Sequence, residues 1–209
     1  MSFINLLKKL PVDLGQGNIN KNLRSKTHGK VIAESIIPNV ENKIALDIGC
    51  REGIQTKWLE SKGYNVISID IEKVYDNCQI VNVNEGLPFE NNSFDLIWSS
   101  ELIEHLENPK ESIKEFERVL KPTGKMVLTT PNSYFWLYKI AKLFNKTPKD
   151  LQNDDHKHFF SEKHIKEILP NSKIYGFFPY MFKKFTIKKN INLLSPTFVI
   201  EASPQQYND

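Results

Sequence analysis

Short apolar runs alternate with segments of helical hydrophobic spacing along the first two thirds of the chain. The apolar runs lie at residues 43–48, 64–69, 79–83, 94–99 and 126–130. Helical spacing follows at 54–61, and again at 109–120 before "KPTGK" interrupts it. The runs are nearly continuous, which is typical of strands buried on both faces, and the helices separate them. This order predicts a mostly parallel sheet covered by helices on both sides.

The pattern changes after Pro131. "NSYFWLYKIAKLF" (132–144) has the spacing of an apolar helix, "TPKDLQNDDHKHFF" (147–160) is typical of a loop, and "SEKHIKEIL" (161–169) predicts a helix with Ser161 as its N-cap. Residues 173–202 predict two or three further strands. We therefore expect an α/β fold: a Rossmann-like, doubly wound sheet of seven mostly parallel strands, with an antiparallel C-terminal edge strand.

Length and composition favour one soluble domain. The chain has 209 residues, of which 40% are hydrophobic and 25% charged, and its formal net charge is +3. That charge is too small to indicate nucleic-acid binding by itself. The two cysteines, Cys50 and Cys78, favour a reducing cytoplasm over a disulfide framework. No stretch of 18 apolar residues predicts a membrane span, although the protein can still contact a membrane surface.

The stretch "ALDIGCREG" (45–53) carries the first candidate chemistry. Asp47, Gly49 and Gly53 stand where the first core strand turns into a helix, which is where open parallel sheets bind ligands. The spacing Gly49-x-x-x-Gly53 departs from the G-x-G-x-x-G of a dinucleotide site, and "PTGKM" lacks the spacing of a P-loop. Both phosphate-binding interpretations are thereby weakened.

A second acid stands at the end of the next strand. Asp70 follows Asp47 by 23 positions, where a carboxylate can bind ribose hydroxyls. Asp47 places a negative charge beside the glycine turn, which suits a sulfonium cation better than a pyrophosphate. The two acids together favour S-adenosyl-L-methionine as the cofactor.

Five segments in order resemble the motifs of class I S-adenosylmethionine-dependent methyltransferases, especially the small bacterial and archaeal type 11 group. These segments are "LDIGCREG", "VISID", "LPFENNSFDLIW", "SSELIEHL" and "EFERVLKPTGKMVLTTPN", within residues 43–132. Carried over by position, the resemblance implies cofactor contacts from Asp47, Gly49, Cys50, Gly53, Asp70, Ile71, Asn82, Val83, Ser99 and Glu101. It also implies one domain over 1–209, with an N-terminal extension (1–24), a cofactor-binding core (25–131) and an acceptor side with a helical insertion and C-terminal strands (132–209).

Two positions depart from the family pattern. Arg51 replaces a common glycine, and Asn82 stands where the family usually has Asp. Because an amide oxygen still accepts a hydrogen bond from an adenine amino group, we expect altered rather than absent cofactor binding. The departures also leave open a binding module that has lost catalysis.

Three histidines are candidates for the acceptor side. His105 follows the fourth strand in "SSELIEHL" and is the first candidate for a general base, with helix packing as the alternative. His156 and His158 alternate in "DDHKHFF", so an extended segment places both on one face. That pair can line an acceptor pocket, or hold a metal with Asp154 or Asp155, or belong to an ordinary loop; we assign no metal site. Glu101 and Glu104 can act at the site or merely complement a helix dipole.

The sequence thus predicts methyl transfer to a small-molecule, lipid or sugar (glycan) acceptor, with oxygen favoured as the acceptor atom. A nucleic-acid methyltransferase is disfavoured, because "SSEL" replaces the Asn-Pro-Pro-Tyr-like turn that grips a target amine. A redox enzyme of the Rossmann type is a more distant alternative. The acceptor's identity and the oligomeric state are not encoded in a readable pattern.

Overall fold

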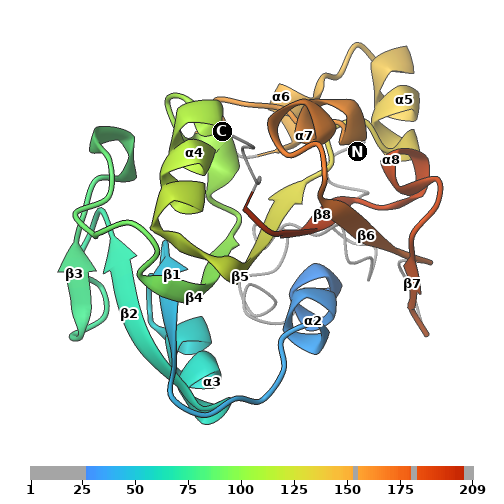
Figure 1. The fold of residues 1–209 in the computed structure, drawn as a ribbon. Coiled ribbons are helices and arrows are strands. Elements are labelled where there is room, and N and C mark those ends of the chain that lie inside the picture. The colour runs from blue at the N-terminus through green and yellow to red at the C-terminus, as the bar shows by residue number, and fades with distance from the viewer. Residues whose placement is uncertain (1–26, 153–154, 180–182, 205–209) are drawn as a thin grey trace.

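The computed structural model describes residues 27–152, 155–179 and 183–204, so the N-terminal extension and Asp154 lie outside the described part. An eight-stranded sheet runs through its centre in the order β3-β2-β1-β4-β5-β8-β6-β7 (Figure 1). The strands are β1 (Lys43–Ile48), β2 (Tyr64–Asp70), β3 (Cys78–Ile80), β4 (Phe94–Ser100), β5 (Leu120–Pro131), β6 (Lys173–Phe178), β7 (Phe185–Ile187) and β8 (Thr197–Ala202). The α-helices are α2 (His28–Ser35), α3 (Ile54–Ser61), α4 (Pro109–Val119), α5 (Trp136–Leu143), α6 (Pro148–Leu151), α7 (Glu162–Ile168) and α8 (Ile191–Leu194), with 3₁₀ turns η2 (Val83–Glu85) and η3 (Ile103–His105).

Parallel pairing joins the first five strands, and the C-terminal strands pair antiparallel. β1 pairs with β2 and β4, β2 with β3, and β4 with β5, all parallel. β8 is antiparallel to both β5 and β6. The predicted fold class is confirmed, with one strand more than the expected seven: the three-residue β7 pairs with β6 at the edge and leaves β8 inside the sheet.

Two hydrophobic cores cover the two faces of the sheet, because successive strand residues point to opposite sides. Leu46 and Ile97 face a core that includes Phe116 of α4 and Ile165 of α7. Leu96 and Trp98 face the other, which includes Leu59 of α3. Figure 1 shows α4 and α7 on one side of the sheet and α2 and α3 on the other. The expectation of helices on both faces is therefore confirmed.

Several element boundaries differ from the expected ones for identifiable reasons. β3 stops at Ile80 instead of continuing to 83, since it is an exposed edge strand and Asn82 caps the following 3₁₀ turn. α5 begins at Trp136 and not at Asn132. The buried Asn132 side chain instead binds backbone groups: its Nδ2 donates to the carbonyls of Ile191, Asn192 and Ser195, and its Oδ1 accepts from the Tyr134 N–H.

Other local predictions hold. α3 spans the predicted 54–61, and Ser161 caps α7 through its Oγ, which accepts from the His164 N–H. The predicted loop 147–160 contains one short helix, α6, whose cap Thr147 exchanges hydrogen bonds with Asp150. Within the described residues, every helix is too short or too polar to cross a bilayer.

Candidate cofactor and acceptor site

A glycine turn links β1 to α3 at the carboxyl edge of the parallel strands. Gly49 has φ 80° and donates its N–H to the Ile69 carbonyl over 2.8 Å, which ties the turn to β2. Gly53 has φ 71° and caps α3. A Cβ at Gly53 would stand 2.6 Å from the Tyr75 ring, whereas one at Gly49 would meet Leu102 at an ordinary 3.5 Å. Gly49 is therefore required by its backbone angle, and Gly53 by both the angle and the packing of Tyr75.

The residues between the two glycines differ in burial. Arg51 is exposed, has φ 44°, and donates its N–H to Asp70 Oδ2 over 2.9 Å. Cys50 is buried, and its N–H also donates to the Ile69 carbonyl, over 3.2 Å. Burial raises the pKa of the Cys50 thiol, so it stays protonated and acts as a small packing group. The loop thus tolerates Arg51 where the family has glycine, because the backbone makes the contact.

Asp47 is a buried carboxylate at the end of β1. Its Oδ2 accepts from Thr56 Oγ1 over 2.6 Å, and Thr56 in turn shares a 2.9 Å hydrogen bond with Ser68. Burial raises the pKa of Asp47 to about 6, against the lowering effects of the Thr56 hydrogen bond and of the Lys30 charge. Lys30 of α2 has its own pKa lowered by burial, although the carboxylates of Glu101 and Asp47 oppose that shift. Asp47 and Lys30 are therefore an acid and a base that interact electrostatically and are both poorly solvated.

The Asp70 carboxylate, at the end of β2, accepts backbone hydrogen bonds from two neighbouring loops. Its Oδ1 accepts from the N–H of Ile71 over 2.7 Å and its Oδ2 from that of Arg51. Oδ1 also accepts from the N–H of Glu72 over 3.3 Å, so Oδ2 is the oxygen that keeps a lone pair for a ligand hydroxyl. Ile71, the next residue, exposes 64% of its surface and offers an apolar face beside it.

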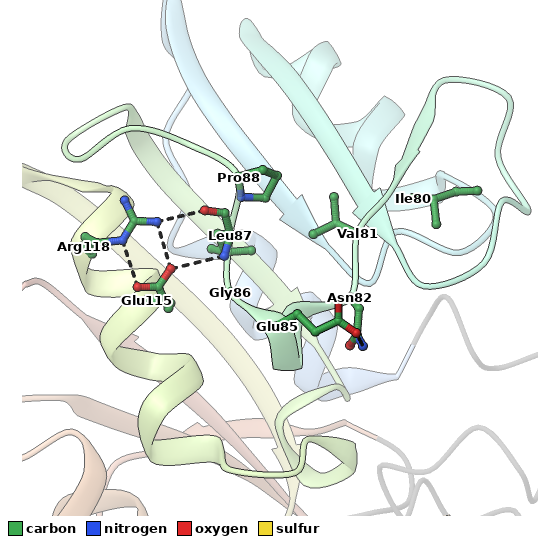
Figure 2. Close-up of a pocket in the computed structure, with 9 residues that line it drawn as sticks. All are labelled: Ile80, Val81, Asn82, Glu85, Gly86, Leu87, Pro88, Glu115 and Arg118. Atoms are coloured by element: carbon green, nitrogen blue, oxygen red, sulfur yellow. Dashed lines mark hydrogen bonds and ion pairs between the residues drawn. The ribbon is translucent and has the colours of Figure 1, made fainter.

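Asn82 and Val83 lie after β3, at the far end of the same edge. Asn82 Oδ1 accepts from the Asn84 N–H over 3.2 Å, and its Nδ2 donates to Glu85 over 2.6 Å. Val83 is buried. A cavity of about 580 Å³ lies between this segment and α4. Figure 2 shows its lining residues, which include the ion pair of Arg118 with Glu115 on α4. Asn82 lines it, but the glycine turn and Asp70 do not.

Ser99 and Glu101 occupy the end of β4. Ser99 is buried, and its Oγ has no hydrogen-bond partner within the part of the chain described. Glu101 has φ 56°, and its N–H and Oε1 both bind Thr129 of β5, each over 2.9 Å. Both residues lie on the edge that carries the glycine turn, because β4 pairs parallel with β1.

A second group of polar side chains, which we call the His-Glu cluster, consists of Glu104, His105 and His156. The Glu104 carboxylate is 1% exposed, and its Oε1 lies 3.9 Å from His105 Nε2 and 4.0 Å from His156 Nε2. The two imidazole rings meet edge to face with centroids 4.7 Å apart. Burial raises the pKa of Glu104 well above its usual range, helped by the nearby Glu101 charge. Burial also lowers the pKa of His156 to about 4, with the His105 charge acting in the same direction.

The three predicted histidines therefore do not form one group. His105 and His156 come together although 51 positions separate them in the sequence. His158 instead places its Nε2 3.0 Å from the Leu106 carbonyl, so its partner is backbone. Asp155 contacts His105, as a 3.4 Å pair between Oδ2 and Nδ1.

Three contributors were not visible in the sequence patterns. Lys30 belongs to α2, outside all motifs, and a lysine within an amphipathic helix gives no distinguishing signal. Gln152 binds His156 Nδ1 over 3.2 Å from the loop before it. Thr130 donates to Glu104 Oε2 over 2.9 Å. "TTPN" after a buried strand is the one local hint, since strand ends on this edge carry polar groups.

The sheet order, the glycine turn after β1 and the carboxylate after β2 together define a class I S-adenosylmethionine-dependent methyltransferase fold. A family described as a methyltransferase domain matches residues 24–172, and the chain belongs to this family. S-Adenosyl-L-methionine is the cofactor that the family and the fold imply.

Relatives and solved structures agree with this assignment. The chain is 32% identical over 128 residues to a ubiquinone biosynthesis O-methyltransferase of Coxiella burnetii, covering 53% of this chain and 55% of that protein. It is 25% identical over 136 residues to the protein of the same name from Hydrogenovibrio crunogenus, covering 56% of each. The chain therefore spans about half the length of the curated relatives it matches.

Two solved structures share the fold. An S-adenosylmethionine-dependent methyltransferase from Archaeoglobus fulgidus has a TM-score of 0.64 at 17% identity, covering 90% of this chain and 100% of that one. One from Methanosarcina mazei has a TM-score of 0.57 at 21% identity, covering 82% and 96%.

Proposed function

We propose that this protein transfers a methyl group from S-adenosyl-L-methionine to an oxygen of a small-molecule, lipid or sugar acceptor. The observation that carries the proposal is the placement of two sites on one edge of the sheet. The glycine turn and Asp70 follow β1 and β2, and the His-Glu cluster follows β4. The name O-methyltransferase of the relatives supports oxygen as the acceptor atom.

The residues present fit the cofactor. Ser99 offers a buried hydroxyl that lacks a partner among the described residues, and Asp70 Oδ2 can accept one more hydrogen bond besides that of Arg51. In this proposal the backbone of Gly49, Cys50 and Gly53 lines the methionine part of the cofactor. The positive charge of Lys30, which interacts with the acids of this region, attracts the cofactor's carboxylate. Asp47 and Glu101 supply negative potential near the sulfonium. Asp70 and Ile71 hold the ribose, and Asn82 and Val83 border the adenine.

The reaction makes few demands on side-chain chemistry. The cofactor, when bound, supplies a methyl carbon already activated by its positive sulfur, so the chain contributes mainly alignment. An oxygen acceptor must lose its proton, and the His-Glu cluster gathers proton-accepting atoms where the acceptor side begins. Because the pKa of His156 is lowered to about 4, its ring is neutral at physiological pH and available as an acceptor.

Calorimetry with S-adenosylhomocysteine, the demethylated cofactor, tests the first half of the proposal. We expect saturable binding by the full chain, and weaker binding by Asp70→Ala. Transfer of a labelled methyl group to catechols, isoprenoid phenols or sugars in a mass-spectrometric assay tests the second half. Absence of cofactor binding would refute the proposal as a whole, and binding without transfer to a broad extract would leave the binding-module alternative.

One observation favours that alternative. Both polar atoms of the Asn82 amide already form hydrogen bonds within its own turn: Oδ1 accepts from the Asn84 N–H, and Nδ2 donates to Glu85. The adenine amino group would then have to share an acceptor that is already in use. An Asn82→Asp variant that binds S-adenosylhomocysteine more tightly would show that Asn82 lowers the cofactor affinity of the wild-type protein. The two free cysteines fit the proposed cytoplasmic location.

A further inference from the structure

The three side chains of the His-Glu cluster present acceptors to one another. Among the described residues, Glu104 Oε1 is buried and has no hydrogen-bond partner, although Oε2 is satisfied by Thr130. A buried carboxylate oxygen without a partner is costly, so its neighbours decide what it is built to receive. Those neighbours are the Nε2 atoms of His105 and His156.

The outer nitrogen of each histidine fixes the state of the inner one. His105 Nδ1 lies 3.3 Å from the Asp155 carbonyl, which can only accept, so Nδ1 carries the proton. His156 Nδ1 lies 3.2 Å from Gln152 Oε1. The orientation of that amide is set by Gln152 Nε2, which donates to the Tyr138 hydroxyl over 3.0 Å, and by the Ser133 hydroxyl, which donates to Oε1. In the neutral form of each ring, Nε2 is therefore unprotonated and presents a lone pair.

Three lone-pair atoms thus converge on a buried point without a donor between them. A shared proton does not fit, because the 3.9 and 4.0 Å separations exceed hydrogen-bond length. A metal ion does fit: with metal–ligand bonds of about 2.0–2.2 Å, two ligand atoms of one ion stand at most about 4.4 Å apart. All three atoms lie within 4.8 Å of one another, so small rotations bring them to bonding distance.

We propose that Glu104, His105 and His156 form a binding site for a divalent first-row transition-metal ion such as Zn²⁺ or Mn²⁺. Two imidazoles and one carboxylate suit these ions better than Mg²⁺ or Ca²⁺, which prefer oxygen ligands. Histidine ligands held from behind by oxygen acceptors are the usual outer arrangement of metal sites, and Asp155 and Gln152 supply it here. His105, 26% exposed, gives the ion a path from solvent.

This inference is independent of the proposed function, although it bears on it. His105 Nε2 cannot hold a metal ion and take a proton from the acceptor at once. A bound ion would therefore replace the predicted general-base role of His105 with that of a ligand. The test accordingly measures metal binding without cofactor or acceptor.

Equilibrium dialysis of the chelator-treated full chain against MnCl₂ or ZnCl₂, followed by elemental analysis, measures the stoichiometry and affinity. We expect one ion per chain. Glu104→Gln and His156→Asn should each weaken binding more than about a hundredfold, and Gln152→Leu about tenfold, as expected for a supporting residue. His158→Asn is the matched control: it lies two residues from His156, its ring binds a backbone carbonyl, and it should leave the affinity unchanged.

Circular dichroism and thermal unfolding verify that each variant is folded. Glu104→Gln is nearly isosteric and removes a buried charge, so it should remain folded even if His156→Asn does not. The Mn²⁺ arm excludes binding through Cys50 and Cys78, since Mn²⁺ prefers oxygen and nitrogen ligands. Absence of saturable binding, or binding that survives in Glu104→Gln with unchanged affinity, would overturn the proposal. Cofactor binding measured on the same variants reports separately on the proposed function.

Discussion

The glycine turn after β1 and the His-Glu cluster after β4 lie on the same edge of the sheet, but their polar groups differ in hydrogen bonding. In the turn, backbone groups are paired across β1 and β2: the N–H groups of Gly49 and Cys50 reach Ile69, and that of Arg51 reaches Asp70. In the cluster, the facing atoms are acceptors without a donor among them. The backbone N–H groups of the first region are paired, whereas the second leaves a buried carboxylate oxygen without a partner among the described residues.

The comparison also separates what each region costs the fold. The turn uses left-handed backbone angles at Gly49, Arg51 and Gly53, which strain any residue with a side chain. The cluster contains buried titratable groups, and burial makes their charged forms unfavourable. Backbone strain is independent of pH, while the second cost changes with protonation, so the two regions are distinguishable by experiment.

Gly53→Ala should have the largest effect on cofactor affinity, because its Cβ would overlap the Tyr75 ring and the residue would have to adopt φ 71°. We expect a loss of about 1–2 kcal/mol in unfolding free energy and of about a hundredfold in affinity for S-adenosylhomocysteine, measured by denaturant titration and calorimetry. Gly86→Ala is the control: it has φ 98° but open space, with Glu115 Oε2 at 3.6 Å, so it should lose stability and keep the affinity. Equal affinities in the two variants would contradict this reading.

Acid should destabilise the metal-free protein through His156. Its pKa is about 6.5 in the unfolded chain and about 4 in the fold, so the unfolded state takes up the proton first as pH falls. Unfolding free energy should fall by about 2–3 kcal/mol between pH 6.5 and 4, and this slope should be absent from His156→Asn. Glu104 titrates in the opposite sense, because burial raises its pKa, so the comparison is made in a Glu104→Gln background. An identical slope in both proteins would show that His156 does not cause it.

Asp70→Ala should weaken cofactor binding by about tenfold, near 1.4 kcal/mol, because a ribose contact and the support for Arg51 and Ile71 are lost together. Calorimetry with S-adenosylhomocysteine measures it. Asp70→Asn keeps one acceptor oxygen and should lie between the wild type and Asp70→Ala. If Asn and Ala behave alike, the charge of Asp70 matters and its geometry does not.

Asp47→Asn should produce the smallest effect and one of opposite sign. Burial raises the folded pKa of Asp47 to about 6 from an ordinary value of 3.8, so ionisation above pH 6 disfavours the fold. The shift is worth about 3 kcal/mol, and the weaker hydrogen bond from Thr56 to an uncharged acceptor offsets part of it. At pH 8 the variant should therefore gain about 1–2 kcal/mol in the free energy of unfolding, and the gain should vanish below pH 4. A loss of cofactor affinity in the same variant would indicate that the wild type carries this cost for binding.

The regions also differ in how far the sequence predicts them. The turn is contiguous, so glycine spacing and the acids at 47 and 70 were sufficient to place it, and the strand and helix order predicted the sheet. The cluster joins Glu104 and His105 to His156 across a chain reversal, and no local pattern encodes that distance. Alternation in "DDHKHFF" placed His156 and His158 together, but the segment is irregular and the two rings bind different partners. Lys30, whose charge acts on Asp47, belongs to a helix that no motif includes.

Asn132 has a consequence for how the molecule opens. One buried amide at the end of β5 donates to the carbonyls of Ile191, Asn192 and Ser195, and thereby links the segment after β5 to α8 and the residues that follow it. Neither segment can detach without exposing that amide. In native-state hydrogen exchange the two should therefore behave as one cooperative unit, with matching opening free energies, although 59 positions separate Asn132 from Ile191.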